Sequence, residues 1–102
     1  MRFAELEHAD VAVWGYGREG RSVLTALRRR FPAKALMLYC GRDEGDAARS
    51  HGDARLHVTG AAPGADALSG HDVVIKSPGI SAYKPEILAA RERGTRFTSG
   101  AA

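Results

Sequence analysis

The sequence contains one cysteine, Cys40, among its 102 residues. A single cysteine cannot form an internal disulfide, and it excludes metal sites of the C-x-x-C type. No apolar run approaches the ~20 residues of a membrane-spanning helix, and the first ten residues lack the basic start and apolar middle of a signal peptide. These absences predict a cytoplasmic protein without a membrane partner.

Sequence motifs of ATP-binding, zinc and nucleophilic catalytic sites are also absent. The sequence has no G-x-x-x-x-G-K-S/T loop for ATP and no H-E-x-x-H zinc motif, and no serine lies in a nucleophile elbow. The histidines lack metal-ligand spacing and are predicted to be surface or packing residues; they are His8, His51, His57 and His71. We therefore predict no catalytic residue, no metal site and no cofactor within this chain.

The composition is that of one globular domain, with 44% hydrophobic and 26% charged residues. The net charge of +3 invites a nucleic-acid interpretation. However, acidic residues are interspersed with the arginines, as at Glu92, and no helix-turn-helix or RNA-binding signature is present. The basic residues are therefore interpreted as solvated helix faces, and no nucleic-acid partner is expected.

Residues 11–20 combine an apolar strand with a glycine turn. Val11–Trp14 is apolar without alternation, as in a strand covered on both faces of a parallel sheet. In the G-x-G-x-x-G pattern that follows, Gly15 allows the tight turn, Gly17 lets phosphates approach, and Gly20 lets the next helix pack closely. The start of that helix attracts anions, most often a nucleotide diphosphate. A turn without a ligand is the alternative.

Hydrophobic periodicity and turn residues predict alternating strands and helices. The expected strands are 11–14, 35–40, 55–59, 72–76 and 96–98; the expected helices are 18–30, 44–50 and 85–93, with at most one helical turn in 61–70. Strand-helix-strand units of this length are right-handed crossovers. The predicted fold class is therefore α/β, a Rossmann-like open, mostly parallel five-stranded sheet flanked by helices, with residues 1–102 in a single domain.

Two further loops follow strands at the edge where open α/β sheets bind ligands. Dinucleotide folds carry a ribose-binding acid about 20 residues after the last glycine, but that position is Cys40. Asp43 could serve if the strand ran longer. Gly41 and Arg42 instead indicate a flat basic rim for a nucleobase or phosphate, with an exposed loop arginine as the alternative.

The other loop, residues 77–80, follows the 72–76 strand. Pro78 stiffens its turn, Gly79 offers an unhindered N–H, and Ser77 supplies a hydroxyl. A tight turn without a ligand is again the alternative.

Taken together, these motifs resemble the N-terminal domain of the Mur ligases. The resemblance rests on G-Y-G-R-E-G-R-S at 15–22, on V-V-I-K-S-P-G-I at 73–80 and on the helix that ends near Gly94. It is strongest to the MurD group, which joins glutamate to UDP-N-acetylmuramoyl-alanine. The wording W-G-Y-G-R-E-G is similar to the branch that adds L-glutamate.

The resemblance implies a binding role within a larger, ADP-forming enzyme of peptidoglycan synthesis. The domain would hold the UDP end of UDP-N-acetylmuramoyl-L-alanine, while further domains would supply ATP, magnesium and the amino acid; alone it is predicted to be inactive. Backbone N–H groups of Arg18 and Glu19 would contact the diphosphate, and the rim at 41–42 the uracil. The full set of implied UDP contacts is Gly15, Gly17, Arg18, Glu19, Gly20, Gly41, Arg42, Ser77, Pro78 and Gly79.

Two other functions compete with this interpretation. A regulatory or redox domain that binds NAD(P) explains the glycine motif equally well, but it expects an acid where Cys40 stands and leaves residues 77–80 unexplained. A structural module without a small ligand is the third alternative.

Overall fold

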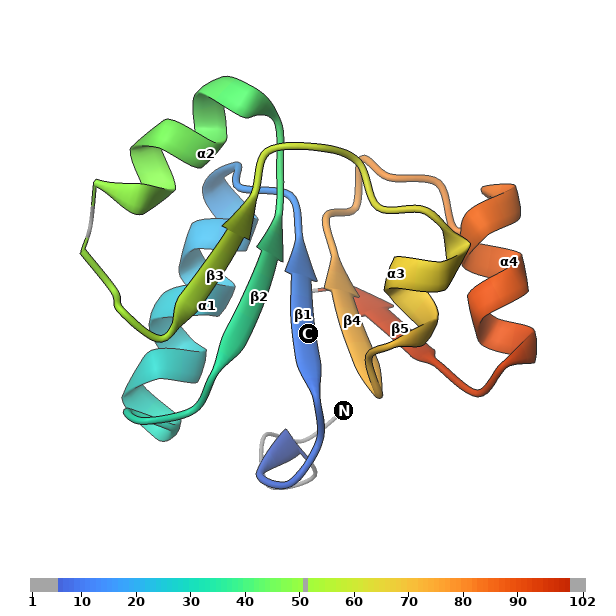
Figure 1. The fold of residues 1–102 in the computed structure, drawn as a ribbon, viewed down its shortest axis with the longest axis horizontal. Coiled ribbons are helices and arrows are strands. Elements are labelled where there is room, and N and C mark those ends of the chain that lie inside the picture. Colours follow the sequence, from blue (N-terminus) through green and yellow to red (C-terminus); the bar gives the residue numbers. More distant parts are fainter. Residues whose placement is uncertain (1–5, 51, 100–102) are drawn as a thin grey trace.

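The structure, a computed structural model, describes residues 6–50 and 52–99. They form a five-stranded sheet of order β3-β2-β1-β4-β5, in which every neighbouring pair is parallel (Figure 1). The strands are β1 (Val11–Trp14), β2 (Leu36–Tyr39), β3 (Leu56–Thr59), β4 (Val73–Lys76) and β5 (Arg96–Ser99); the helices are α1 (Arg18–Arg30), α2 (Arg42–Arg49), α3 (Ala65–Ser69) and α4 (Pro85–Glu92). The predicted Rossmann-like α/β fold is confirmed, with an entirely parallel sheet.

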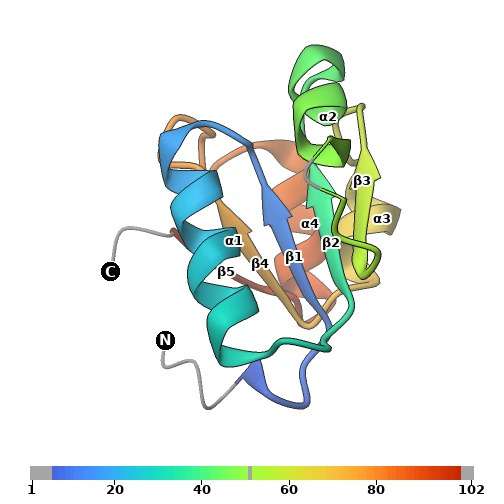
Figure 2. The same ribbon diagram turned by 90° about the vertical axis from the view of Figure 1, so that its left-hand side faces the viewer.

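Helices cover both faces of the sheet. Figure 2 shows α1 in front of the strands and α4 behind them. The side chains of β1 alternate between two cores: Val13 packs among residues of α1 and α2, whereas Trp14 packs with Leu68 of α3 and Ile87 of α4. All four residues of β1 are consequently buried, which explains the apolar run without alternation.

Helix α1 follows the prediction at both ends. It begins directly after Gly17 and ends at Arg30; the C-cap residue Phe31, which precedes Pro32, is not helical, as expected from the steric restriction that proline imposes. Arg28 then fixes the end of the helix: its guanidinium donates to the carbonyl oxygens of Phe31, Pro32 and Lys34 and pairs with both carboxylate oxygens of Asp53. This network ties the last turn of α1 to the segment before β3.

The structure corrects the predicted start of the second helix. Residues 44–50 were expected, but α2 begins at Arg42, directly after Gly41. The Glu44 side chain accepts a hydrogen bond from the Gly41 N–H at 3.1 Å, which is one half of a capping box. Because β2 ends at Tyr39, Asp43 lies in the first turn of α2 and not at the strand tip. Arg42 lies in this same turn and is no loop residue.

The remaining boundaries differ from the prediction by about a residue. Gly94, expected as a helix cap, follows α4 with a φ of +104°, in the left-handed region that favours glycine. The 61–70 segment contains the short helix α3 and packs it against α4.

A buried threonine, Thr95, links α3 to the segment just before β4. Thr95 is 4% exposed, and its Oγ1 lies 3.3 Å from the carbonyl oxygen of Leu68 and 3.0 Å from that of His71. The exchange Thr95→Val keeps the shape but removes the donor, so two buried carbonyls lose a partner. We expect a loss of about 1–2 kcal/mol in unfolding free energy, measured by urea denaturation. The exposed Thr25→Val should change it by less than about 0.5 kcal/mol; equal effects would contradict a role for the buried hydroxyl.

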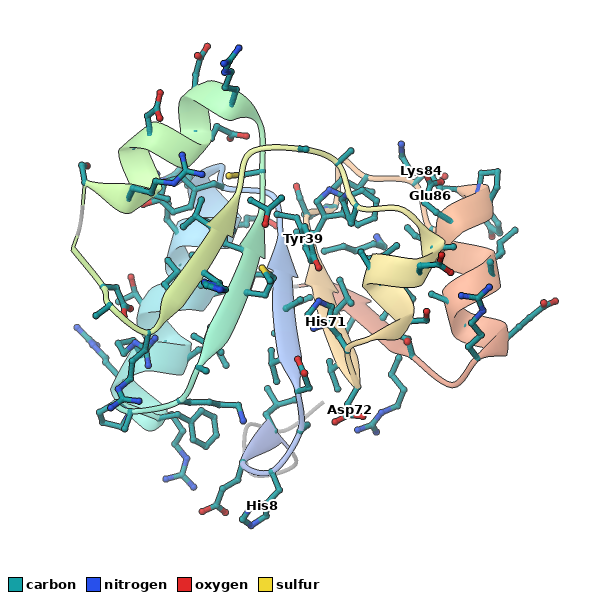
Figure 3. The ribbon with its side chains drawn as sticks, in the orientation of Figure 1. His8, Tyr39, His71, Asp72, Lys84 and Glu86 are labelled. Atoms are coloured by element: carbon teal, nitrogen blue, oxygen red, sulfur yellow. The ribbon has the colours of Figure 1, made fainter. Side chains whose placement is uncertain are left out.

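A hydrogen-bonded chain crosses the sheet near its amino edge. The Tyr39 hydroxyl lies 2.8 Å from His71 Nε2, and His71 Nδ1 lies 2.7 Å from Asp10 Oδ1 (Figure 3). Burial, with the Asp10 carboxylate second, raises the pKa of Tyr39 above its ordinary value, so the phenol keeps its proton and donates. The network then assigns the His71 proton to Nδ1. His71 is thus a packing residue with both nitrogens bonded, as the sequence predicted.

Candidate functional site

The strand order reverses between β1 and β4, and the loops after these two strands lie side by side. The chain runs outward from β1 to β2 and β3 on one side, and from β4 to β5 on the other. The Ser77 N–H donates to the Trp14 carbonyl at 2.8 Å, while the Gly15 N–H donates to the Tyr39 carbonyl at 2.7 Å. The glycine turn therefore sits at the topological switch point, where open α/β sheets bind ligands.

Each glycine of the turn has its own physical reason. Gly15 has a φ of +107°, and a Cβ there would lie 2.9 Å from Ser77 Cβ. A Cβ on Gly20 would lie 2.1 Å from the Gly15 carbonyl oxygen. The sequence predicted that Gly20 allows the helix to pack on the sheet, but its close contact is with the preceding turn. A Cβ on Gly17 would meet nothing within 4 Å, which leaves open space above the turn.

The start of α1 has unused hydrogen-bond donors. Gly17 is the N-cap residue in an extended conformation, and no side chain among the described residues caps the helix. The first N–H groups of a helix have no intrahelical partner, and here they belong to Arg18, Glu19 and Gly20. Together with the positive end of the helix dipole they favour an anion above Gly17. Glu19 is the one acidic residue in this first turn, and it is exposed.

The start of α2 differs in charge. Its first turn contains the carboxylates of Asp43 and Glu44, and Glu44 already accepts the Gly41 N–H. The helix dipole is therefore largely compensated by the helix's own acids. Arg42 is exposed at this position. Of the helix starts of α1 and α2, that of α1 suits a phosphate better, while the rim at 41–42 suits an uncharged part of a ligand.

Cys40 packs inward and is no part of an exposed rim. Its side chain is buried, with Sγ 3.9 Å from the Thr59 carbonyl oxygen. A Cβ on Gly45 would lie 3.7 Å from that sulfur, so the thiol fills space under α2. Burial first and the Glu44 carboxylate second raise the pKa of Cys40, which keeps it a neutral thiol at pH 7.

The turn at residues 77–80 is closed by its own hydrogen bonds. The Ile80 N–H donates to the Ser77 carbonyl at 3.0 Å, and the Gly79 N–H lies 3.4 Å from Ser77 Oγ. The Gly79 N–H, which the sequence indicated as an unhindered donor, thus has a long internal bond. Pro78 is exposed on the outside of the turn.

Two lysines near this turn were missed by the sequence analysis. The Lys76 ammonium donates to the Ile80 carbonyl at 3.1 Å. The Lys84 ammonium lies 5.9 Å from the centre of the ring of Trp14, the last residue of β1. Trp14 and Lys84 are far apart in the sequence, so no local motif signalled this contact.

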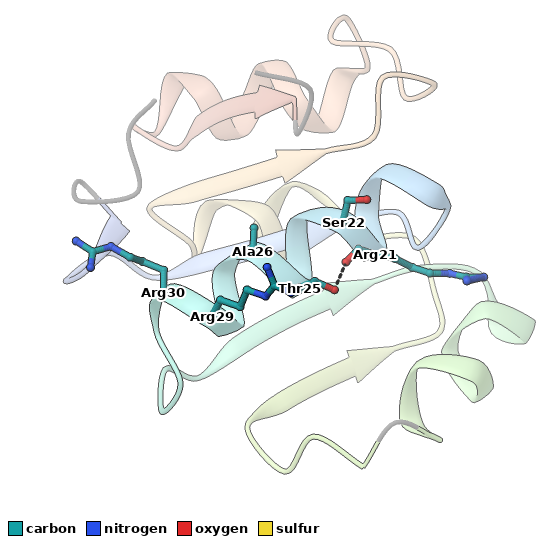
Figure 4. Close-up of a pocket in the computed structure, with 6 residues that line it drawn as sticks. All are labelled: Arg21, Ser22, Thr25, Ala26, Arg29 and Arg30. Atoms are coloured by element: carbon teal, nitrogen blue, oxygen red, sulfur yellow. Dashed lines mark hydrogen bonds between the residues drawn. The ribbon is translucent and has the colours of Figure 1, made fainter.

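Two hollows of the described surface lie away from the switch point. One of about 630 Å³ is lined by six residues of a single helix, so it is a dent on the outer face of α1 (Figure 4). Another, of about 690 Å³, lies at the amino edge of the strands near Asp10, Lys34 and His71. Between Trp14, Gly20 and Ser77 the enclosed space is about 10 Å³. Among the described residues, the candidate site is therefore an open rim.

Other classes of site find no support in the part of the chain that the structure describes. Within residues 6–50 and 52–99, no group of three or more His, Cys, Asp and Glu side chains could hold a metal ion. None of the helices there is long and apolar enough to cross a membrane. His51, one of the four predicted surface or packing histidines, lies outside the described residues.

An all-parallel sheet, helices on both faces and a glycine turn at the switch point define a Rossmann-like α/β domain. No family model matches the chain. Curated ligases do: the UDP-N-acetylmuramoyl-L-alanine–L-glutamate ligase of Xanthomonas oryzae pv. oryzae is 45% identical over 102 residues, which are 100% of this chain and 22% of the ligase. The chain belongs to the Mur ligase family, in which it corresponds to an N-terminal segment.

More distant organisms have relatives with the same name. The ligase of Xylella fastidiosa (strain Temecula1) is 40% identical over 100 residues, covering 98% of this chain and 21% of the ligase. That of Salinispora tropica is 36% identical over 107 residues, covering 100% and 23%. The chain thus spans less than a quarter of the length of the curated relatives it matches. The resemblance inferred from the motifs is confirmed.

Proposed function

We propose that this chain is the UDP-binding part of an ATP-dependent ligase that adds glutamate to UDP-N-acetylmuramoyl-L-alanine in peptidoglycan synthesis. The observation that carries the proposal is the uncapped start of α1 beside the open space at Gly17, at the switch point of the sheet. The names of the relatives, which specify a UDP-linked acceptor and L-glutamate, support the same substrate.

The proposed contacts follow from the three loops at this edge. The diphosphate lies above Gly17 and accepts hydrogen bonds from the backbone N–H groups at the start of α1. The uracil lies toward the rim of Gly41 and Arg42, and Ser77 closes the other side. The remaining proposed contacts are Gly15, Arg18, Glu19, Gly20, Pro78 and Gly79.

The other parts of the reaction belong to the rest of a full-length ligase. We assign ATP, magnesium and the amino acid to those domains, which are the predicted partners of this one and would close over its open rim. In this proposal ATP converts the muramoyl peptide's carboxylate into an acyl phosphate, which the glutamate amine attacks. The chain by itself is expected neither to hydrolyse ATP nor to form an amide bond. A cytoplasmic location, where the sequence places it, goes with this role.

The NAD(P) alternative has less support. The relatives reported above are ligases whose names give a UDP-linked substrate, and an NAD(P) domain leaves the turn at residues 77–80 unexplained.

Titration with UDP tests the proposal directly. We expect a Kd on the order of 1 mM, because an open rim without its covering domains orders a flexible ligand at a high entropic cost. NMR shift changes should be confined to residues 15–20, 41–44 and 77–79. NADH is the matched ligand in the same experiment: tighter binding of NADH than of UDP would contradict the proposal, as would UDP-induced shifts at the amino edge.

A further inference from the structure

The tip of the second strand lacks the acid that nucleotide-binding folds of this type carry. There, an Asp or Glu about 20 residues after the glycine motif accepts a hydrogen bond from a ribose hydroxyl. In this chain the position is Cys40, whose thiol packs under α2 near the Thr59 carbonyl oxygen. The strand itself therefore provides no carboxylate to the rim.

The first turn of α2 begins directly beyond the end of β2 (Figure 1), and it contains the carboxylate of Glu44. Glu44 Oε1 lies 3.1 Å from the Gly41 backbone nitrogen, so its side chain folds toward the strand end. The Glu44 carboxylate is also, after burial, a cause of the raised pKa of Cys40. Glu44 has thus the right charge in the place of the missing acid.

Glu44 also has acceptor capacity left. A carboxylate offers about four lone-pair sites, and the structure gives Glu44 one hydrogen bond, to Gly41. The residue is exposed, so the remaining sites face solvent at the rim. Its neighbour Asp43 does not fold back on Gly41 among the described contacts, since successive helix residues point about 100° apart.

We propose that Glu44 supplies the missing carboxylate and accepts a hydrogen bond from a ribose hydroxyl of the nucleotide that binds at this edge. The inference rests on the proposed function, because it requires a nucleotide with its diphosphate at the glycine turn. It makes Glu44 a specificity-determining residue that distinguishes ribonucleotides from their deoxy analogues. The fold thereby moves a strand-tip acid into the following helix, where it serves as cap and ligand at once.

The test compares UDP with 2′-deoxy-UDP and 3′-deoxy-UDP in NMR titrations of the 102-residue chain. We expect UDP to bind about tenfold more tightly than one of the deoxy analogues, because a hydrogen bond to a charged group is stronger than one between neutral groups. In Glu44→Gln the ratio should fall to about threefold or less, with an unchanged melting curve, since the Gln amide oxygen can still cap Gly41. Asp43→Asn removes the same charge from the same turn and should keep the tenfold ratio.

Three results would overturn the inference, and they are distinguishable. The same discrimination in the parent chain and in Glu44→Gln would show that another group holds the ribose. A Glu44→Gln effect on N3-methyl-UDP discrimination, without one on the deoxy analogues, would place the carboxylate at the base. No UDP response in the parent chain at all would remove the proposed function itself, and the inference with it.

Discussion

Gly20→Ala is expected to destabilise the fold by about 3 kcal/mol or more, at the upper end of the cost of overpacking. The new Cβ would lie 2.1 Å from the Gly15 carbonyl oxygen and 2.9 Å from its carbon, and both are backbone atoms. The turn cannot move easily, because the Gly15 N–H donates to the Tyr39 carbonyl and the Trp14 carbonyl accepts from the Ser77 N–H. Thermal unfolding should shift down by at least about 12 °C.

Gly45→Ala is the matched control for this result. Gly45 is also a buried helical glycine, but its Cβ would meet neighbours only at 3.5 Å or beyond, which is ordinary contact. Since alanine is the better helix former, we expect this variant to be as stable as the parent or up to about 1 kcal/mol more stable. Equal melting temperatures for Gly20→Ala and the parent would mean that the turn rearranges and that the third glycine is dispensable.

Gly17→Val is expected to abolish the UDP response and leave the melting curve unchanged. Gly17 has a φ of −77° and an extended ψ, which a β-branched residue adopts without strain. Because a Cβ there would meet no described atom within 4 Å beyond its chain neighbours, the added methyl groups would extend into the space proposed for the diphosphate. We expect no saturable shift with UDP up to about 10 mM, a loss of at least tenfold on the Kd proposed above.

Gly64→Val provides the comparison. Gly64 is likewise an extended N-cap residue with nothing near its Cβ, but it begins α3 and is outside the proposed contacts. This variant should keep both its melting curve and its UDP response. If Gly17→Val remained folded and bound UDP normally, the phosphates would have to lie elsewhere, and the role assigned to the glycine turn would be wrong.

The sequence predicted best the elements whose ends are marked by local chemistry. Helix α1 was predicted to the residue because a glycine turn precedes it and Pro32 follows it. The predicted start of α2 was two residues too late. Gly41 and Glu44 have the spacing of a capping box, but a glycine cap has no side chain to signal it. The three loops of the candidate site were placed at one edge because parallel strands all end there.

Contacts between distant residues could not be predicted in the same way. The hydrogen-bonded chain from Tyr39 through His71 to Asp10 joins residues that are brought together only by the order of the strands. The inward packing of Cys40 depends on the space under Gly45, which no local pattern reveals. Such features follow from tertiary packing, whereas the glycine turn follows from backbone conformation at single positions.

The central strand of the sheet is also the first to be synthesised, and this sets the timing of folding. β1 can pair with β2 early, since Ala12 lies opposite Met37, but its other edge pairs with β4, where Val11 lies opposite Val73. Pairing β1 with β4 closes a long loop, because β2 and β3 lie between them in the sequence. Such loop closure is slow compared with local helix formation. Until β4 and the helices around it emerge, the nascent β1 has one unpaired edge and Trp14 has no core to enter. The single tryptophan will therefore report the last stage of assembly, when the second helical layer docks on the sheet.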